Sequence, residues 1–224
     1  MKRVVVSHSG GKDSMLALHR IIERDDVIVD RLLTTVNETY NRTSVHGNRE
    51  ELLDLQADAL DLTLQKVYLP QSPTNEQYNN LMKEALQEAV NDGVTHIVYG
   101  DINLADIRAF REQQVEDLAL EAIFPLWNES TEKLINEFIQ LGYKTLITTI
   151  DPSRVPREFL GASLDEGTVE RLPYDVDVCG ENGEFHTFVV DGPLFKKPLP
   201  VKLGESVVEE PFYTYQDVVR DRVD

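Results

Sequence analysis

The 224-residue sequence predicts an α/β protein with a five-stranded, parallel, doubly wound sheet and a smaller α+β C-terminal domain. Two observations predict this fold. Apolar β-branched runs alternate with segments of helical period over residues 1–128, and after residue 128 proline-containing connectors and β patterning replace that alternation. We therefore expect a first domain at 1–128 and a second at 129–224.

The elements of the first domain follow from their patterns. Arg3–Val6 is a short β-branched run typical of a buried parallel strand. The next helix carries Met15 and Ile22 on one apolar face, with Asp13 and Ser14 where capping residues belong. The alternation then predicts strands at 28–36, 63–69, 95–99 and 122–126 and helices at 49–60, 76–90 and 112–119.

The second domain has a different texture. We expect a helix at 132–141, a strand at 144–150, a short helix at 165–171 and β structure after it. Asn182-Gly183 lies between two extended segments and predicts a hairpin, because both residues tolerate positive φ. Residues 213–224 have mixed charge, and we expect a mobile tail there.

Composition limits the class of protein. A hydrophobic content of 41% is enough for a sizeable core. No apolar stretch approaches membrane-spanning length and no signal peptide is visible, so we expect a cytoplasmic protein. Cys179 is the only cysteine, which excludes an internal disulfide and a multi-cysteine zinc cluster and favours a buried small residue.

The net charge bears on the class of partner. There are 22 basic and 40 acidic residues, so the charge is 22 − 40 = −18. Such a charge repels a nucleic-acid backbone, and no long basic run offsets it. This argues against a tRNA substrate.

The turn Ser9-Gly10-Gly11-Lys12-Asp13-Ser14 between the first strand and helix is the most informative motif. Gly10 and Gly11 have no side chains to block a polyanion, so backbone N–H groups and the positive end of the helix can point at phosphate oxygens. Lys12 adds a full positive charge. The sequence therefore predicts ATP as the ligand.

The turn is not a Walker A loop. That loop needs a glycine five positions before the Gly-Lys pair and a hydroxyl residue directly after it, whereas Val6 and Asp13 occupy those places. This weakens a kinase or GTPase interpretation. The remaining alternative is a glycine turn with a solvated lysine.

Two further loops follow predicted strands and so lie at the same edge of a parallel sheet. In the loop 37–47, His46 is a candidate nucleotide contact, with a capping or packed loop histidine as the alternative. Gly100 and Asp101 follow the fourth strand, where the Asp101 carboxylate can hold Mg²⁺ or cap a helix. Arg108 can hold a substrate carboxylate or phosphate, or be an exposed helix arginine.

Glu181, Glu184 and His186 form the last candidate group. Glu184 and His186 lie two apart on a predicted strand and so share a face. A carboxylate beside an imidazole suits ligand orientation or proton transfer. The alternative is a hairpin with ordinary surface side chains.

The pattern of residues 9–14 resembles the SGG-x-DS signature of the PP-loop ATP pyrophosphatases, which implies a HUP (Rossmann-like) fold. Residues 180–187 (GENGEFHT) and 191–195 (DGPLF) are similar to the signature of the diphthine–ammonia ligase family. Further matches to that family span most of the chain: His46-Gly47, Gln56-Ala57, Gly100-Asp101-Ile102 with Arg108, Pro125-Leu126-Trp127, Gly161 and Leu172-Pro173.

The resemblance implies an AMP-forming amide ligase that uses ATP, Mg²⁺ and ammonium. In such a reaction the acceptor carboxylate attacks the α-phosphate, pyrophosphate leaves, and ammonia displaces AMP from the acyl-adenylate. No glutaminase domain is evident, which implies free ammonium or a separate partner as the ammonia source.

The resemblance also implies roles for the candidate residues. The backbone of Ser9–Gly11, with Lys12 and Ser14, would hold the leaving pyrophosphate. Asp13 and Asp101 would position Mg²⁺. The acceptor or ammonia would meet the three residues of the second motif, Glu181, Glu184 and His186.

The acceptor stays open. Diphthamide enzymes usually carry a second glutamate where this chain has His186, so the acceptor is either a modified histidine of a protein or a small molecule such as a cobalamin-related carboxylate. Two other functions are alternatives: RNA modification by the same adenylation chemistry, and a non-catalytic nucleotide sensor. The sequence does not determine the oligomeric state, for which a homodimer is one candidate.

Overall fold

A computed structural model describes residues 1–43, 47–209 and 212–221. The chain divides into two compact units. The first contains the parallel sheet and its helices, and the second contains Gly10–Lys12, the helix near residue 55 and an antiparallel sheet formed by the C-terminal part of the chain. The domain boundary at 128/129 stays a prediction.

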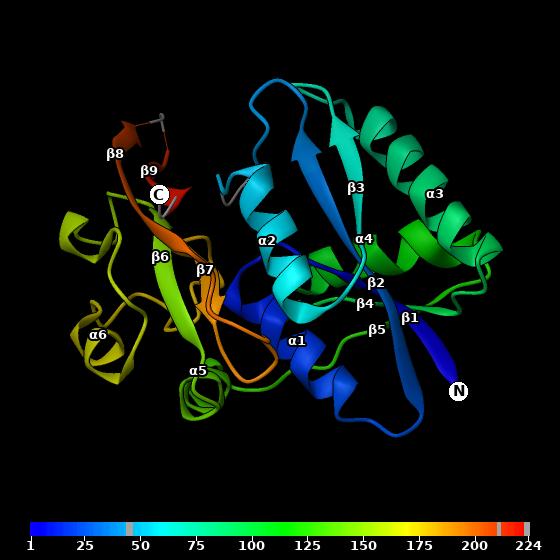
Figure 1. The fold of residues 1–224 in the computed structure, drawn as a ribbon, viewed down its shortest axis with the longest axis horizontal. Helices are drawn as coiled ribbons and strands as arrows, with labels where there is room; N and C mark the ends of the chain where they lie inside the picture. The colour runs from blue at the N-terminus through cyan, green and yellow to red at the C-terminus, as the bar shows by residue number, and fades with distance from the viewer. Residues whose placement is uncertain (44–46, 210–211, 222–224) are drawn as a thin grey trace. The chain divides into compact units, whose positions relative to one another are not determined.

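Five parallel strands form the sheet of the first unit (Figure 1). They are β1 (Lys2–Ser7), β2 (Val27–Asn37), β3 (Leu64–Leu69), β4 (His96–Val98) and β5 (Glu121–Ile123). Their order is β3-β2-β1-β4-β5, which confirms the predicted doubly wound sheet. The order reverses at β1, so the carboxyl ends of β1 and β4 flank the switch point where ligands of such sheets bind.

The core of this unit follows the alternation of β1. Val5 joins a buried cluster with residues of β2 and β3 and of two helices, α3 (Asn75–Asn91) and α4 (Ala105–Glu116). Val4 and Val6 therefore face the other side of the sheet and are also fully buried. On α1 (Lys12–Ile22), Ile21 is buried but Ile22 is 42% exposed, so the predicted inward position of Ile22 is wrong.

The boundaries of α4 differ from the prediction. The helix begins at Ala105, well before the predicted start at residue 112, and ends at Glu116. Val115 is its one buried residue among those described. The first turns therefore carry no apolar stripe from which a helix could be predicted.

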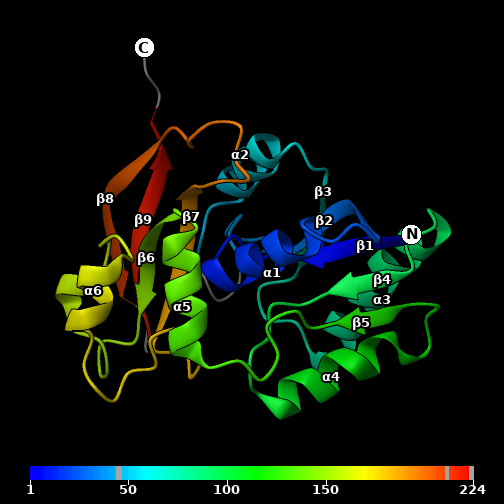
Figure 2. The ribbon, with the colours of Figure 1, turned by 90° about the horizontal axis from the view of Figure 1, so that it is seen from below.

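The second unit contains an antiparallel sheet with the order β7-β6-β9-β8 (Figure 2). Its strands are β6 (Lys144–Ile150), β7 (Phe185–Asp191), β8 (Val201–Glu209) and β9 (Thr214–Arg220). Its helices are α2 (Glu50–Leu60), α5 (Thr131–Gln140), α6 (Glu166–Arg171) and the 3₁₀ turn η1 (Arg157–Phe159).

Two predictions for this unit are wrong. The expected C-terminal tail contains β9, which pairs with both β6 and β8. Its Asp217 is buried because Arg49 donates to both carboxylate oxygens, at 3.0 and 2.6 Å. Asn182-Gly183 is a tight turn, with Gly183 at φ +80°, but the segment before it is not a strand, so there is no hairpin.

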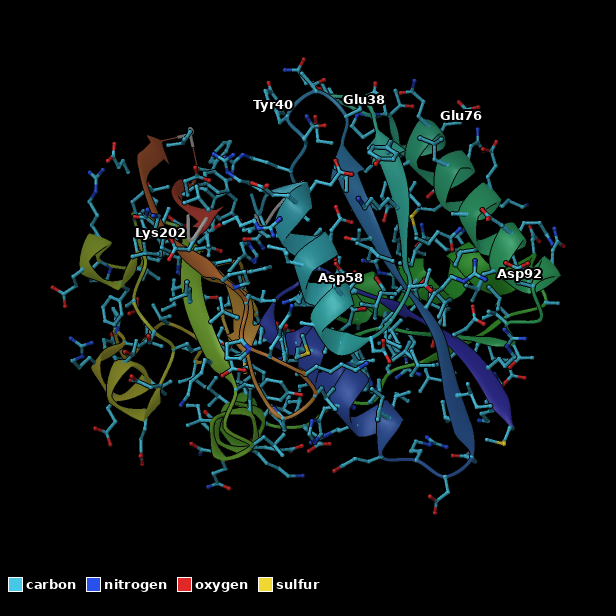
Figure 3. The ribbon with its side chains drawn as sticks, in the orientation of Figure 1. Glu38, Tyr40, Asp58, Glu76, Asp92 and Lys202 are labelled. Atoms are coloured by element: carbon cyan, nitrogen blue, oxygen red, sulfur yellow. The ribbon has the colours of Figure 1, made fainter. Side chains whose placement is uncertain are left out.

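The surface agrees with the strong negative charge. Glu38 and Glu76 are exposed and point away from the ribbon, and the exposed Asp92 pairs with Arg31 at 2.6 Å (Figure 3). Over the ranges that the structure describes, no helix is both long enough and apolar enough to span a bilayer.

Candidate functional site

Ser9 and Ser14, the first and last residues of the turn after β1, both belong to the first unit. The Ser9 backbone N–H donates to Ser14 Oγ at 3.3 Å, and the Oγ atoms of Ser9 and Ser14 are 3.2 Å apart. Because α1 begins at Lys12, Asp13 and Ser14 lie in its first turn rather than before it. The predicted capping position is therefore wrong: the Ser14 hydroxyl closes the turn onto Ser9.

Gly100 lies where the end of β4 meets the start of α1. A Cβ at this position would come within 2.9 Å of the backbone carbon and oxygen of Asp13 and within 3.0 Å of the Ser14 nitrogen. Only glycine permits this approach. The structure thus brings together the segments after β1 and β4, as expected from the switch point.

Asp101 is half-buried next to Gly100. Burial raises the pKa of the Asp101 carboxyl, and the charge of Asp13 acts in the same direction. The guanidinium of Arg111 opposes them, with Nε 3.8 Å from Asp101 Oδ2. Carboxylate oxygens are ligands that a small hard cation prefers.

Arg108 lies on α4 against two aromatic rings. Its guanidinium carbon is 4.9 Å from the ring centre of Phe124 and 4.7 Å from that of Trp127. Its Nε donates to Glu112 at 2.8 Å. Stacking and this bond fix the plane of the guanidinium, which suits recognition of a planar or tetrahedral anion by the remaining N–H groups.

Gly10 belongs to the second unit, where it packs against α2 and β7. Its φ is +82°, and an added Cβ would lie 2.9 Å from a Leu53 methyl carbon and 3.1 Å from the Phe188 ring. Its carbonyl oxygen accepts hydrogen bonds from the Val189 N–H at 2.9 Å and from Gln56 Nε2 at 3.1 Å. Both backbone conformation and space therefore require glycine here.

Lys12 is 4% exposed, although lysine is rarely buried without a partner. Its backbone N–H donates to Thr187 Oγ1 at 3.1 Å, and its Nζ donates to the carbonyl oxygen of Cys179. Cys179 is buried, as predicted. The lysine of the turn is thus held at both ends by residues from the C-terminal part of the chain.

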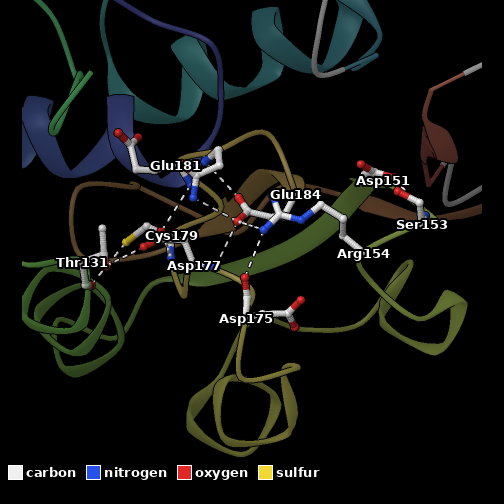
Figure 4. A network of polar contacts seen from close by, with 10 residues as sticks. Thr131, Asp151, Ser153, Arg154, Asp175, Asp177, Cys179, Glu181 and Glu184 are labelled. Carbon is white, nitrogen blue, oxygen red and sulfur yellow. Dashed lines mark hydrogen bonds and ion pairs between the residues drawn. The ribbon is translucent and has the colours of Figure 1, made fainter. Parts of the chain in front are cut away.

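The loop that offers this carbonyl is organised by Asp177 (Figure 4). Asp177 Oδ1 accepts from the N–H groups of Cys179 at 2.8 Å and Glu181 at 3.2 Å, and Oδ2 accepts from the Thr131 hydroxyl at 2.7 Å. The sequence analysis missed Asp177. The available signal was an aspartate two residues before Cys179-Gly180, which is typical of an Asx turn.

Glu184 is fully buried just before β7, not on the strand as predicted. Burial acts to raise its pKa, but the N–H of Asp177 (3.1 Å), the amide of Asn182 (3.1 Å) and the charge of Arg154 (3.0 Å) together hold the pKa below its ordinary value. Asp177 lies in the loop before Glu184, and Arg154 reaches it from the segment after β6 (Figure 4). The carboxylate is therefore ionised and fixes the loop.

His186 lies on β7, two residues after Glu184. Its burial, together with the nearby Lys12 ammonium, lowers its pKa to about 4, although Glu184 acts in the opposite direction. The ring centre of Tyr213 is 5.8 Å from the imidazole. His186 is thus neutral at pH 7 and can accept or donate one hydrogen bond at each nitrogen, according to its tautomer.

The candidate nucleotide contact His46 lies outside the described residues. A cluster of three or more His, Cys, Asp or Glu side chains able to hold a metal ion does not occur within the described part of the chain. The assignment of Asp13 and Asp101 as Mg²⁺ ligands stays a prediction.

The sheet order, the glycine turn after β1 and the close approach of Gly100 define a class: doubly wound α/β proteins that bind an anionic ligand at the switch point. The chain belongs to the diphthamide synthase family. The family's N-terminal domain matches residues 1–122 and its C-terminal domain matches residues 130–219. The resemblance predicted from the two motifs is therefore confirmed.

Two of the similar proteins are diphthine–ammonia ligases, and a third has another name. The diphthine–ammonia ligase of Danio rerio is 29% identical over 238 residues, covering 92% of this chain and 89% of the relative. The diphthine–ammonia ligase of Homo sapiens is 28% identical over 236 residues, covering 92% and 85%. An argininosuccinate synthase of Dictyoglomus turgidum is 22% identical over 228 residues, covering 91% and 57%.

Proposed function

We propose that this protein is an ATP-dependent, AMP-forming amide ligase that converts a carboxylate into an amide with ammonia, as a diphthine–ammonia ligase does. The observation that carries the proposal is the buried Lys12 in a glycine turn at the carboxyl end of β1. A buried ammonium and the positive end of α1 are suited to an anion as large as pyrophosphate. Membership of the diphthamide synthase family supports the same reaction.

The chemistry assigns roles to the chain's own residues. The backbone of the turn, with Lys12 and Ser14, holds the pyrophosphate that leaves when the acceptor oxygen attacks the α-phosphate. Ammonia then forms the C–N bond and loses a proton as AMP departs. We propose that the imidazole of His186, which a pKa of about 4 keeps neutral but weakly basic at pH 7, orients the ammonia through a hydrogen bond and that the released proton passes to water.

The two glutamates of the second motif have different roles in this proposal. The four donors around Glu184 leave it to fix the loop, so we propose a positioning role for it. The Glu181 side chain is partly exposed, and its backbone N–H is held by Asp177. We propose that Glu181 contacts the acceptor or ammonia, and that Arg108 binds an anionic part of the acceptor.

We propose that the carboxylates of Asp13 and Asp101 hold Mg²⁺, because both offer the oxygen ligands that this ion prefers and both lie where β4 meets the start of α1. When bound, the ion would neutralise charge on the phosphates. We also propose free ammonium as the nitrogen source, a cytoplasmic location and, as one assembly to be tested, a homodimer.

The test is release of pyrophosphate and AMP from ATP with Mg²⁺ and ammonium. Two acceptors are compared: an elongation factor carrying diphthine, and a panel of small-molecule carboxylates that includes cobalamin precursors. Turnover dependent on one acceptor identifies the substrate. Tight binding of ATP without turnover on any acceptor would instead favour a nucleotide sensor, and acceptor activity of tRNA would favour RNA modification.

A further inference from the structure

We propose that Gln56 is a positioning residue for the turn after β1. Its carboxamide fixes the peptide between Gly10 and Gly11 so that the Gly11 N–H is directed toward the bound pyrophosphate. The pyrophosphate part of this inference rests on the proposed function, whereas the peptide orientation is a property of the chain alone.

Gln56 lies on α2 and is fully buried. Its Nε2 donates to two backbone carbonyls, Gly10 at 3.1 Å and Val189 at 2.7 Å. The Val189 N–H also donates to the Gly10 carbonyl, at 2.9 Å. These three hydrogen bonds connect α2, β7 and the turn, and both N–H groups of the carboxamide are used.

A buried carboxamide has a high free-energy cost unless its donors are satisfied, so an apolar residue would serve better if packing were its only role. What Gln56 adds over a leucine or methionine is direction. It holds one carbonyl of the turn and one carbonyl of β7 in a fixed relationship.

The peptide geometry carries this direction into the turn. The peptide bonds of the described residues are trans, so a carbonyl and the N–H of the next residue point in opposite directions. Fixing the Gly10 carbonyl toward Gln56 and Val189 therefore directs the Gly11 N–H away from them. Gly10 has φ +82°. Because the backbone of glycine has many accessible conformations, the peptide after Gly10 could take other orientations without these hydrogen bonds.

The experiment compares Gln56→Met with a matched control. Methionine keeps the length and volume of the side chain but has no donor. Gln65→Met is the control. Gln65 lies on β3, and its Nε2 likewise donates to a backbone carbonyl, that of Ala85 at 3.2 Å. Binding of an ATP analogue with a methylene group between the α- and β-phosphates is measured, together with the amide resonance and hydrogen exchange of Gly11 by NMR.

We expect Gln56→Met to weaken analogue binding by roughly tenfold or more, to shift the Gly11 amide resonance and to speed its exchange. Gln65→Met should bind like the unaltered protein even if its thermal stability falls as far. A Gln56→Met protein with unchanged affinity and an unchanged Gly11 amide overturns the inference, as does a loss of stability alone.

Two further outcomes are covered. If Gln56→Met does not fold, the side-chain amide protons of Gln56 in the unaltered protein decide: protection from exchange supports the inference, and exchange at the rate of an exposed glutamine overturns it. If the unaltered protein does not bind the analogue, the proposed function fails, but the Gly11 amide in Gln56→Met still reports whether Gln56 orients the peptide.

Discussion

The ammonium of Lys12 donates to the carbonyl oxygen of Cys179, a residue 167 positions further along the sequence. The same loop carries Asp177, whose carboxylate accepts from the Cys179 N–H, and Glu181. The lysine expected to bind phosphate and the carboxylate expected to meet the acceptor thus depend on one loop.

Replacing Lys12 by methionine should lower the rate of pyrophosphate release by roughly 10²- to 10³-fold, because a charge aimed at the leaving group is lost. The side chain is buried, so methionine keeps its packing. Turnover with ATP, Mg²⁺, ammonium and the acceptor is the measurement. Lys83→Met is the control, since Lys83 is exposed and pairs with Asp117 at 3.5 Å. Retention of most of the turnover in the Lys12 variant would contradict the proposed role.

An alanine at Gly100 should be strongly unfavourable. Its methyl group would lie 2.9 Å from the Asp13 backbone, so either β4 or the start of α1 must move. We expect a loss of about 1–3 kcal/mol in the free energy of unfolding and weaker analogue binding. Denaturant unfolding provides the measurement. Gly167→Ala is the control. Gly167 lies in α6, and an added Cβ there would be 3.7 Å from the nearest atom, so alanine should leave the free energy of unfolding equal or higher.

The lowered pKa of His186 should make the free energy of unfolding smaller in mild acid than at pH 7. Its folded-state pKa of about 4 lies below the ordinary value of 6.5, so between these values the unfolded chain binds more protons. The stability that neutral His186 permits is present above pH 6.5 and is lost progressively as the pH falls to about 4, by up to about 3 kcal/mol. Unfolding free energy against pH, compared with His186→Gln, measures it. An NMR titration midpoint of His186 near 6.5 would refute the expected burial effect.

Ionised Glu184 should stabilise the fold, and this stabilisation should be lost at a lower pH than that of neutral His186. Its folded-state pKa is depressed, so its contribution is present above the unfolded value of about 4.5 and is lost as the pH falls through the folded value. Glu184→Gln should remove part of the acid sensitivity below pH 4.5 and cost about 1–3 kcal/mol at pH 7, because an NH₂ group replaces one of the two oxygens that together face four donors. Glu166→Gln, at an exposed position in the first turn of α6, is a suitable control. Equal acid sensitivity in both variants would count against this account.

Much of the fold could be predicted from the sequence, because its signals are local. The valines of β1 and the apolar runs of β2 and β3 are continuous, as buried parallel strands require, and the glycines of the turn stand directly after β1. The parallel sheet and its strand number followed from that alternation. The two family motifs are also contiguous, so the family could be named from them.

The missed features depend on distant partners. A charged residue such as Asp217 makes the sequence of β9 look like a tail, but its carboxylate is buried in an ion pair with Arg49, the residue before α2. Gln56 acts on backbone carbonyls of two distant segments, and no spacing pattern identifies such contacts in a single sequence. For Asp177 the sequence offers only the local signal of an Asx turn. Glu184 was placed on a strand because the local pattern alternates, but hydrogen bonds from Asp177 and Asn182 hold it in the preceding turn.

The hydrogen bonds of Gly10 and Lys12 described above join them to Gln56 and to residues 179–189. During synthesis, the glycine turn therefore leaves the ribosome long before the strand and loop that hold it. A nascent chain of about 130 residues contains β1 to β5 but not Thr187 or Cys179. We expect such a chain to gain the ability to bind nucleotide only when β7 has emerged.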